Sequence, residues 1–409
     1  MQTQLPQAFR TTPEGREAEA ILRACVHCGF CTATCPTYRL LGDERDSPRG
    51  RIYLIKQLLE GAPVSRITQT HLDRCLTCRS CETTCPSGVR YARLLEIGRL
   101  EVERRVRRPP HQVLARWAVR QVVPRPQRLR RFLGLARLAR PLLPAGLRRQ
   151  LPRRNEPPPA WPEPRHARRM LILEGCAQAV LTPQVNAALA RILDALGISL
   201  VRVAGAGCCG ALSQHLAAAD EAHAWMRRNI DAWWPEIEAG AEAVVVSASG
   251  CGVTVKEYGE QLAGDGAYAE RARRVAELAR DPVEILEKEP LETIAWRPTA
   301  EPLVFHPPCT LQHGQRLAGR VEALLDRLGF DRRPVADRHL CCGAAGSHAV
   351  LQPRLANRLR AERLAALQAS APAQIATANV GCQHHLAAAA GVPVRHWLEV
   401  LAEALPHDS

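Results

Sequence analysis

The feature that most constrains this chain is a pair of identical cysteine runs in its first hundred residues. Each run has the spacing C-x2-C-x2-C-x3-C-P, and each cysteine of the second run lies 50 residues after its counterpart. This spacing is typical of bacterial ferredoxins, in which three thiolates of one run ligate one cluster and the fourth ligates the other. The pattern predicts two [4Fe–4S] clusters, held by Cys25, Cys28, Cys31 and Cys85 and by Cys35, Cys75, Cys78 and Cys81.

Two other uses of closely spaced cysteines fit these runs less well. Zinc sites pair two C-x2-C knuckles or add histidines, and they leave no role for a third close cysteine followed by x3-Cys-Pro. A disulfide framework needs an oxidising compartment. The N-terminus MQTQLPQAFRTTPEG lacks the basic and apolar regions of a signal peptide. The runs therefore predict a chain that relays electrons singly and carries no catalytic residue of its own.

The segment between the two runs predicts a helix. Ser47 is a candidate N-cap, Pro48 fits the first helical position and Gly61 fits the end. Between them, apolar residues recur at helical spacing, at Ile52, Ile55, Leu58 and Leu59. We expect a small α-helical ferredoxin-like domain over residues 1–100.

The remaining eight cysteines form a second duplication, offset by about 133 residues. The two copies are Cys176, Cys208, Cys209 and Cys251, and Cys309, Cys341, Cys342 and Cys382. In both copies 31 residues separate the single cysteine from a vicinal pair that is followed by Gly. Most of these cysteines follow apolar runs such as MLILEGC and AVVVSASGC, with helical patterns between them. This alternation predicts two α/β cysteine-rich (CCG) domains with parallel sheets, over residues 169–297 and 298–409.

In parallel sheets the carboxyl ends of the strands form the binding crevice, so each copy can bring four cysteines together. Buried single cysteines often act only as small apolar side chains, but the repeated vicinal pairs favour a functional site. A further iron–sulfur cluster, another metal, or a thiol-lined site for a quinone or a partner all fit. Histidines lie near the second copy, at His306, His313, His339, His384 and His385, whereas the first has only His215. We predict none of them singly as a ligand.

The net charge of +14 is concentrated in one segment. Residues 101–169 contain 19 of the 55 basic residues, all of them Arg, and 4 of the 41 acidic residues. The accompanying Leu and Pro predict short amphipathic helices and a Pro-rich linker, in a connector over residues 101–168. Such a connector suits docking to a partner, contact with an anionic membrane surface, or nucleic-acid binding. The aromatic content of 4% and the lack of a recognisable motif argue against nucleic acid.

Longer stretches resemble a known family. The segments ILRACVHCGFCTATCPTYRLLGDE, PRGRIYLIKQLLEG, HLDRCLTCRSCETTCPSGVRY, NIDAWWPEIEAGAEA, SASGCGVTVKEYG and CTLQHGQ resemble the iron–sulfur subunits of flavin-linked 2-hydroxyacid dehydrogenases, most closely those of bacterial glycolate oxidase (glycolate dehydrogenase). The resemblance implies a multi-subunit enzyme. An FAD-binding subunit would oxidise glycolate to glyoxylate, a second flavoprotein-like subunit would assist, and this chain would pass electrons toward quinone.

The resemblance has one departure. In relatives such as heterodisulfide reductase the CCG motif continues into a final C-x2-C, which gives five cysteines per site. Here Cys251 is followed by Gly-Val-Thr and Cys382 by Gln-His-His, so that five-cysteine site is not carried over. The iron–sulfur subunit of a D-lactate or anaerobic glycerol-3-phosphate dehydrogenase, and a heterodisulfide-reductase-type thiol catalyst, stay as alternatives.

The chain also lacks a sequence signal for membrane insertion. No run approaches the roughly 18 apolar residues of a membrane-spanning helix. We therefore expect a cytoplasmic chain that is peripherally associated with the inner membrane.

Overall fold

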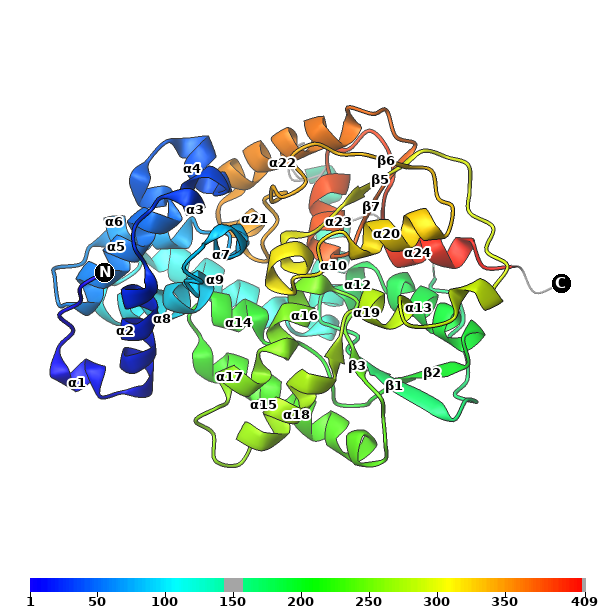
Figure 1. The fold of residues 1–409 in the computed structure, drawn as a ribbon, viewed down its shortest axis with the longest axis horizontal. Coiled ribbons are helices and arrows are strands. Elements are labelled where there is room, and N and C mark those ends of the chain that lie inside the picture. Colours follow the sequence, from blue (N-terminus) through cyan, green and yellow to red (C-terminus); the bar gives the residue numbers. More distant parts are fainter. Residues whose placement is uncertain (143–156, 407–409) are drawn as a thin grey trace.

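The computed structural model describes residues 1–142 and 157–406. It contains an N-terminal helical body and two α/β units, each built on a four-stranded sheet. In Figure 1 the helical body, blue to cyan, lies at the end of the molecule opposite the C-terminus, and the two units, green to red, make up the rest. This is the fold class that the two cysteine patterns predict.

Short helices make up the N-terminal body, and the predicted helix between the runs is one of them. They are α1 (Gln7–Arg10), α2 (Pro13–Ala24), α3 (Phe30–Ala33), α4 (Pro36–Leu41), the 3-10 turn η1 (Glu44–Asp46), α5 (Pro48–Leu59), α6 (Arg66–Asp73), α7 (Ser80–Thr84) and α8 (Tyr91–Arg105). Helix α5 begins as expected, because the Ser47 hydroxyl accepts the Gly50 N–H at 2.9 Å. Its buried face packs on α8, where a Cβ on Gly98 would lie 2.7 Å from Ile55 Cγ1.

The basic connector begins inside the helical body. Helix α8 runs past residue 100, and Val102 and Val106 are buried in the N-terminal core. Two further helices, α9 (Pro110–Val122) and α10 (Pro126–Leu138), and the turn η2 (Arg140–Leu142) follow. The predicted short helices are thus confirmed as far as residue 142, and residues 143–156 of the connector lie outside the described residues. Within the described part of the chain, no helix combines the length and apolarity that a membrane crossing requires.

Each α/β unit has a parallel sheet with the same strand order. The sheets are β2-β1-β3-β4 and β6-β5-β7-β8. Their strands are β1 (Arg168–Ile172), β2 (Ile198–Arg202), β3 (Val244–Val245), β4 (Ala279–Arg280), β5 (Leu303–His306), β6 (Arg332–Arg333), β7 (Gln374–Thr377) and β8 (Val394–His396). The matching order confirms that the second half of the chain is a duplication.

Helices surround both sheets. In the first unit they are α12 (Gln178–Leu181), α13 (Gln184–Ala195), α14 (Ala211–His215), α15 (Ala219–Glu238), α16 (Ser249–Lys256), α17 (Tyr258–Gln261), α18 (Ala269–Leu278), α19 (Pro282–Leu286) and the turn η3 (Leu291–Thr293). In the second they are the π-helical turn η4 (Thr310–Gly314), α20 (Arg320–Arg327), α21 (His348–Leu351), α22 (Pro353–Gln368), α23 (Val380–Ala387) and α24 (Trp397–Glu403).

The two units share one apolar core. Helix α13 packs on α24, and buried residues of both sheets belong to the same cluster. Backbone contacts also join them, because the Ser249 N–H donates to the Ala378 carbonyl at 3.1 Å. The shared core holds the two cysteine sets in a fixed relative position.

A buried carboxyl at this junction makes stability depend on pH. Asp281 is fully buried. Its carboxyl accepts a hydrogen bond from the Val283 N–H at the start of α19 and another, at 3.1 Å, from Gln315 Nε2 of the second unit. Burial raises the pKa of Asp281 to about 7, compared with about 3.9 in an unfolded chain. Between these values the folded chain holds the extra proton, so the free energy of unfolding falls as pH rises, by at most about 1.4 kcal/mol per pH unit.

We expect Asp281→Asn to remove this contribution between about pH 4 and 7, while it keeps the acceptor for the Val283 N–H. Thermal unfolding midpoints measured across that range test the prediction. Asp265→Asn is the control, because Arg227 lowers the pKa of Asp265 and that carboxyl titrates below the range. An unchanged slope in Asp281→Asn would contradict the assignment.

Candidate functional site

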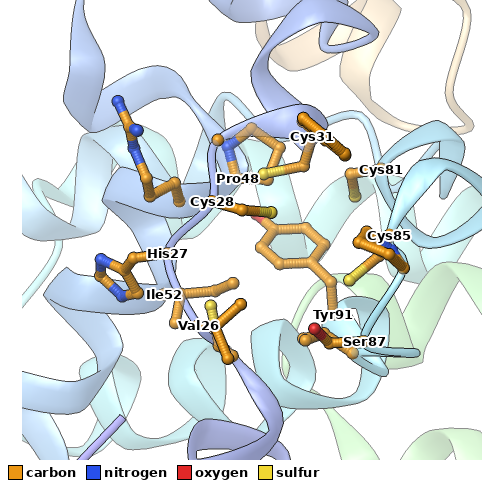
Figure 2. A pocket seen from close by; sticks show the side chains of 16 residues that line it. Val26, His27, Cys28, Cys31, Pro48, Ile52, Cys81, Cys85, Ser87 and Tyr91 are labelled. Atoms are coloured by element: carbon orange, nitrogen blue, oxygen red, sulfur yellow. The ribbon is translucent and has the colours of Figure 1, made fainter.

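The first three thiols of the first run share a cavity with the last thiol of the second. Cys25, Cys28, Cys31 and Cys85 line a cavity of about 30 Å³, and Cys81 of the second run lines it with them. Figure 2 shows Cys28, Cys31, Cys81 and Cys85 around it. The run bends around the cavity through left-handed backbone at His27 (φ 55°) and Gly29 (φ 88°), before α3 begins.

Cys35 lies with the second run. Burial raises the pKa of the Cys78 thiol well above its ordinary value, and the neighbouring Cys309, Cys35 and Cys75 raise it further. Burial and the nearby thiols of Cys78, Cys75 and Cys35 act on Cys81 in the same direction. The structure therefore places Cys85 with the first three thiols of the other run and Cys35 near the second run, as cross-ligation predicts, and Cys81 lies beside both sets.

A buried network of polar groups fixes Cys35 beside the second run. The Cys35 thiol lies 3.2 Å from the Thr37 hydroxyl, which donates to the Asp46 carbonyl at 2.9 Å. The buried Arg51 donates to Thr37 Oγ1 at 3.1 Å, to Asp46 Oδ1 at 3.2 Å and to the His71 carbonyl at 2.7 Å. One guanidinium thus ties α5 to α4 and α6, and holds the last cysteine of the first run in place.

The burial of these thiols suits metal ligation. Burial raises the pKa of Cys31 to about 11, so the free thiol keeps its proton at neutral pH. A bound cation stabilises the thiolate, so the thiol loses its proton when metal binds. Deprotonation of the thiol is therefore coupled to metal loading. Thiols from both runs surround this one small cavity, and a cubane cluster takes four thiolates from such a set.

In each α/β unit four thiols form a continuous row. Cys309 Sγ and Cys341 Sγ lie 3.8 Å apart, and the row continues through Cys342 to Cys382. The first unit has the corresponding row, Cys176, Cys208, Cys209 and Cys251. In that row the neighbours Cys208 and Cys251 lower the pKa of Cys209. Each set of four therefore converges, as the strand pattern predicts.

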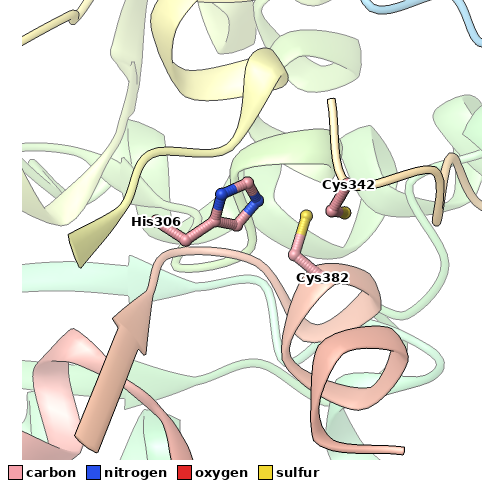
Figure 3. Close-up of side chains that lie close together, drawn as sticks. All are labelled: His306, Cys342 and Cys382. Atoms are coloured by element: carbon pink, nitrogen blue, oxygen red, sulfur yellow. The ribbon is translucent and has the colours of Figure 1, made fainter. Parts of the chain in front are cut away.

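In the second unit His306 lies beside the row of thiols. The sequence indicated it only as one of five histidines near this copy. Figure 3 shows the His306 ring facing Cys342 and Cys382, and one ligand atom of each of the three lies within 4.8 Å of the others. Arg363 Nε donates to His306 Nδ1 at 3.0 Å. A guanidinium can only donate, so Nδ1 is the acceptor and the proton of the neutral ring lies on Nε2.

This tautomer decides what His306 does. With Nδ1 bonded to Arg363 and Nε2 carrying the proton, neither nitrogen has a free lone pair for a metal. The ring instead presents an N–H group to the two sulfurs. The equivalent position in the first unit is Leu173, so this donor belongs to the second unit alone. The sequence did contain a signal for this role, because His306 at the end of its strand aligns with the aliphatic Leu173 of the other copy.

All three thiol-rich regions meet at one large cavity. It has a volume of about 1110 Å³ and is lined by Cys75 and Cys78 and by all eight cysteines of the two units. Cys78 packs in one apolar cluster with Cys309 and Cys341. Arg99 lines it too and donates to the carbonyls of Leu72 and Cys75 at 2.9 and 2.8 Å. The second run therefore adjoins the second unit directly.

Comparison with known proteins places this arrangement in a family. Residues 21–89 match the 4Fe-4S dicluster domain, and residues 170–256 and 303–387 match the cysteine-rich domain. The glycolate oxidase iron-sulfur subunit of Escherichia coli (strain K12) is 56% identical over 408 residues, which cover 100% of both chains. The chain belongs to the glycolate oxidase iron–sulfur subunit family.

More distant relatives match this chain at lower identity. The probable glycolate oxidase iron-sulfur subunit of Bacillus subtilis (strain 168) is 27% identical over 90% of this chain and 88% of its own. Lactate utilization protein A of Bacillus licheniformis is 26% identical, over 55% of this chain and 95% of its own. The family membership and the dicluster domain agree on electron transfer as the role of this chain within an oxidoreductase.

The His306 assignment predicts a specific mutant phenotype. His306→Leu should keep the iron content of the wild-type protein, because the ring is not a ligand. It should also lower the free energy of unfolding by about 1–3 kcal/mol, because Arg363 Nε loses its acceptor in a buried site. Iron assay and thermal unfolding measure the two effects, and Leu173→Val is the control for a change at the equivalent position. Loss of iron in His306→Leu would make His306 a ligand after all.

Proposed function

We propose that this chain carries two [4Fe–4S] clusters in a glycolate oxidase complex. The proposed ligands are Cys25, Cys28, Cys31 and Cys85 for the first cluster and Cys35, Cys75, Cys78 and Cys81 for the second. The observation that carries the proposal is the shared cavity of Cys85 with the first three thiols of the other run. Each cluster, when bound, takes up and releases one electron at a time, while the chain's own residues hold and shield it.

The two α/β units offer a further site each. Their four-thiol rows, at Cys176, Cys208, Cys209 and Cys251 and at Cys309, Cys341, Cys342 and Cys382, support an additional iron–sulfur cluster or metal. The second row has the stronger case, because the His306 ring faces its sulfurs and His306 Nε2 is buried without a hydrogen-bond partner among the described residues. We propose the domain limits 1–100, 101–168, 169–297 and 298–409.

The flavin chemistry is proposed for a partner chain. Oxidation of glycolate to glyoxylate releases two electrons and two protons, which an FAD-binding subunit accepts, and a second flavoprotein-like subunit completes the complex. This chain then passes the electrons singly toward quinone, whose reduction to quinol takes up two electrons and two protons. A 56% identical relative that is named as an iron–sulfur subunit of glycolate oxidase supports such a division of labour.

Oxidation of D-lactate is the second candidate function. Relatives named lactate utilization protein A match about half of this chain and support lactate as a substrate, without deciding between its D and L forms. The substrate test compares glycolate, D-lactate and glycerol 3-phosphate as reductants of the clusters in the reconstituted complex. A strict preference for D-lactate or glycerol 3-phosphate would replace glycolate as the substrate.

The connector supports peripheral contact with the inner membrane from the cytoplasmic side. Residues 104–155 contain no acidic residue. On α10 the exposed apolar side chains Phe132 (56% exposed), Leu135 (67%) and Leu138 (80%) follow the exposed Arg128 and Arg131. Apolar side chains enter the lipid interface and Arg pairs with anionic headgroups. We propose that this α10 stripe lies on the membrane surface.

The cluster assignment predicts about eight iron atoms per chain from the two runs, and about twelve or more if the α/β units also bind clusters. Iron assay and electron paramagnetic resonance on anaerobically purified protein give the count and the type. Cys85→Ala should disturb the cluster of Cys25, Cys28 and Cys31, whereas Cys35→Ala should disturb the other. The reverse pattern, or a total near four, would refute cross-ligation.

The membrane proposal predicts charge-dependent binding to vesicles. Arg128→Glu with Arg131→Glu should weaken binding to phosphatidylglycerol-containing vesicles by about tenfold or more, because each basic residue near the surface contributes about 1 kcal/mol. The control is Arg273→Glu with Arg274→Glu, an equal change of charge at exposed positions of α18. Vesicle flotation measures both, and equal losses in the two variants would show a non-specific effect of charge.

A further inference from the structure

The two cysteine runs have the same local backbone, so one run is a reference for the other. His27 and its counterpart Thr77 have φ of 55° and 53°, and Gly29 and its counterpart Arg79 have φ of 88° and 60°. A short helix follows in both, α3 in the first run and α7 in the second. The surroundings of the runs, rather than their folds, account for differences in exposure between equivalent residues.

The exposure of the two runs is opposite. In the second run Leu76 and Ser80 are 6% and 1% exposed, whereas their counterparts Val26 and Phe30 are 68% and 61% exposed. The cysteines follow the same rule. All sixteen lie in the described part of the chain, and among them only Cys28 is exposed, whereas its counterpart Cys78 is buried. One face of this repeated fold is therefore covered in the second run and bare in the first.

The α/β units cover the face of the second run. Leu76 and Cys78 pack with Cys309 and Cys341 of the second unit. Thr83 Oγ1 lies 2.8 Å from His313 Nδ1 of the same unit, and a guanidinium pairs with the first unit, where Arg79 Nη2 donates to Glu257 Oε2 at 2.8 Å. This internal example shows that the face packs against a protein unit that carries its own row of thiols.

The corresponding face of the first run has the composition of a protein interface. We define the open face as Val26, Cys28, Phe30 and Tyr53. The Tyr53 side chain is 48% exposed, and its ring packs edge-on to the His27 ring, with 6.4 Å between the ring centroids. It surrounds the thiol edge of the first cavity with apolar and aromatic side chains, as Figure 2 shows for Val26 and Cys28. Exposed apolar patches of this kind mark interaction sites, and aromatic residues are enriched in protein interfaces.

The charges beside the open face favour a protein over a lipid surface. The charged groups around His27 are Arg49, Glu44, Lys56 and the N-terminal amine. Arg49 pairs with Glu44 and Lys56 pairs with Glu60, so the neighbouring charges are mixed and largely neutralise each other. Such a surface offers an anionic membrane little net attraction. The acid-free stripe of α10 has the opposite character, and the two surfaces therefore suit different partners.

We propose that the open face is the docking site of the flavin-bearing partner subunit and the point where electrons enter this chain. The proposal rests on the proposed function, because it needs a flavoprotein as electron donor. Docking there brings the donor against the exposed thiol edge of the first cluster. The second run, buried against the second unit, then receives the electron from within the chain.

The test uses the full-length, cluster-loaded chain and the FAD-binding subunit co-expressed with it. Because Val26 and Phe30 also line the first cavity, iron content and the resonance spectrum of Val26→Glu with Phe30→Glu are measured first, and binding is compared at equal cluster loading. At equal loading the double variant should bind that subunit about tenfold or more weakly, since buried interface aromatics are frequent hot spots. Reduction of the clusters by glycolate at limiting subunit concentration should slow by a similar factor. Phe30→Ser, which copies Ser80 of the other run, should give a smaller loss in the same direction.

Ile67→Glu is the matched control, because Ile67 is 59% exposed on α6 of the same body and lies outside the open face. It should bind and be reduced like the wild-type protein. Equal affinity of the double variant and the wild type would overturn the docking site while leaving the complex intact. Loss of self-association or of vesicle binding, with flavoprotein binding retained, would assign the face to another partner and overturn the proposal. A wild-type chain that neither binds the flavoprotein nor accepts its electrons would remove the proposed function itself.

Discussion

The closure of the two cysteine runs onto each other is the constraint on which the N-terminal body depends. Cys85 shares a cavity with the thiols of the first run, and Cys35 lies among those of the second. Neither set is complete without a residue from the other end of α5, so α3, α5 and α7 must pack together before four thiols meet. Burial raises the pKa of the Cys31, Cys78 and Cys81 thiols, and metal ligation needs the thiolate, so folding of this body is coupled to loading with metal.

Duplication supplied both halves of the molecule, and each pair of copies has since become unequal. The two α/β units keep one strand order, yet a strand end that carries Leu173 in the first carries His306 in the second, with Arg363 fixing its tautomer. The two runs keep one backbone, yet only one has its face covered. Function follows these differences, because symmetric copies would offer an electron no preferred direction.

The sequence predicted what depends on local spacing and missed what depends on distant residues. Ligand runs, the cap at Ser47 and the alternation of strands and helices are written in short windows, and the structure contains all of them. The role of His306 could not be read in this way, because it requires a donor 57 residues later, on α22. The large cavity is likewise formed by three separate segments, and only the packing of the helical body on both units brings them together.

The thiol sets differ in exposure along the molecule. The first set reaches the surface at Cys28, the second is buried, and Cys78 of the second set packs on Cys309 of the second unit. His348 and Arg99 both line the large cavity between the helical body and the two units. Burial and the nearby Arg99 lower the pKa of His348 to about 4, so this ring is neutral at physiological pH. The fixed positive charge there comes from guanidinium groups, and it favours an added electron at the buried end of the chain. If the open face is the point of entry, as proposed, an electron that moves inward approaches these guanidinium groups.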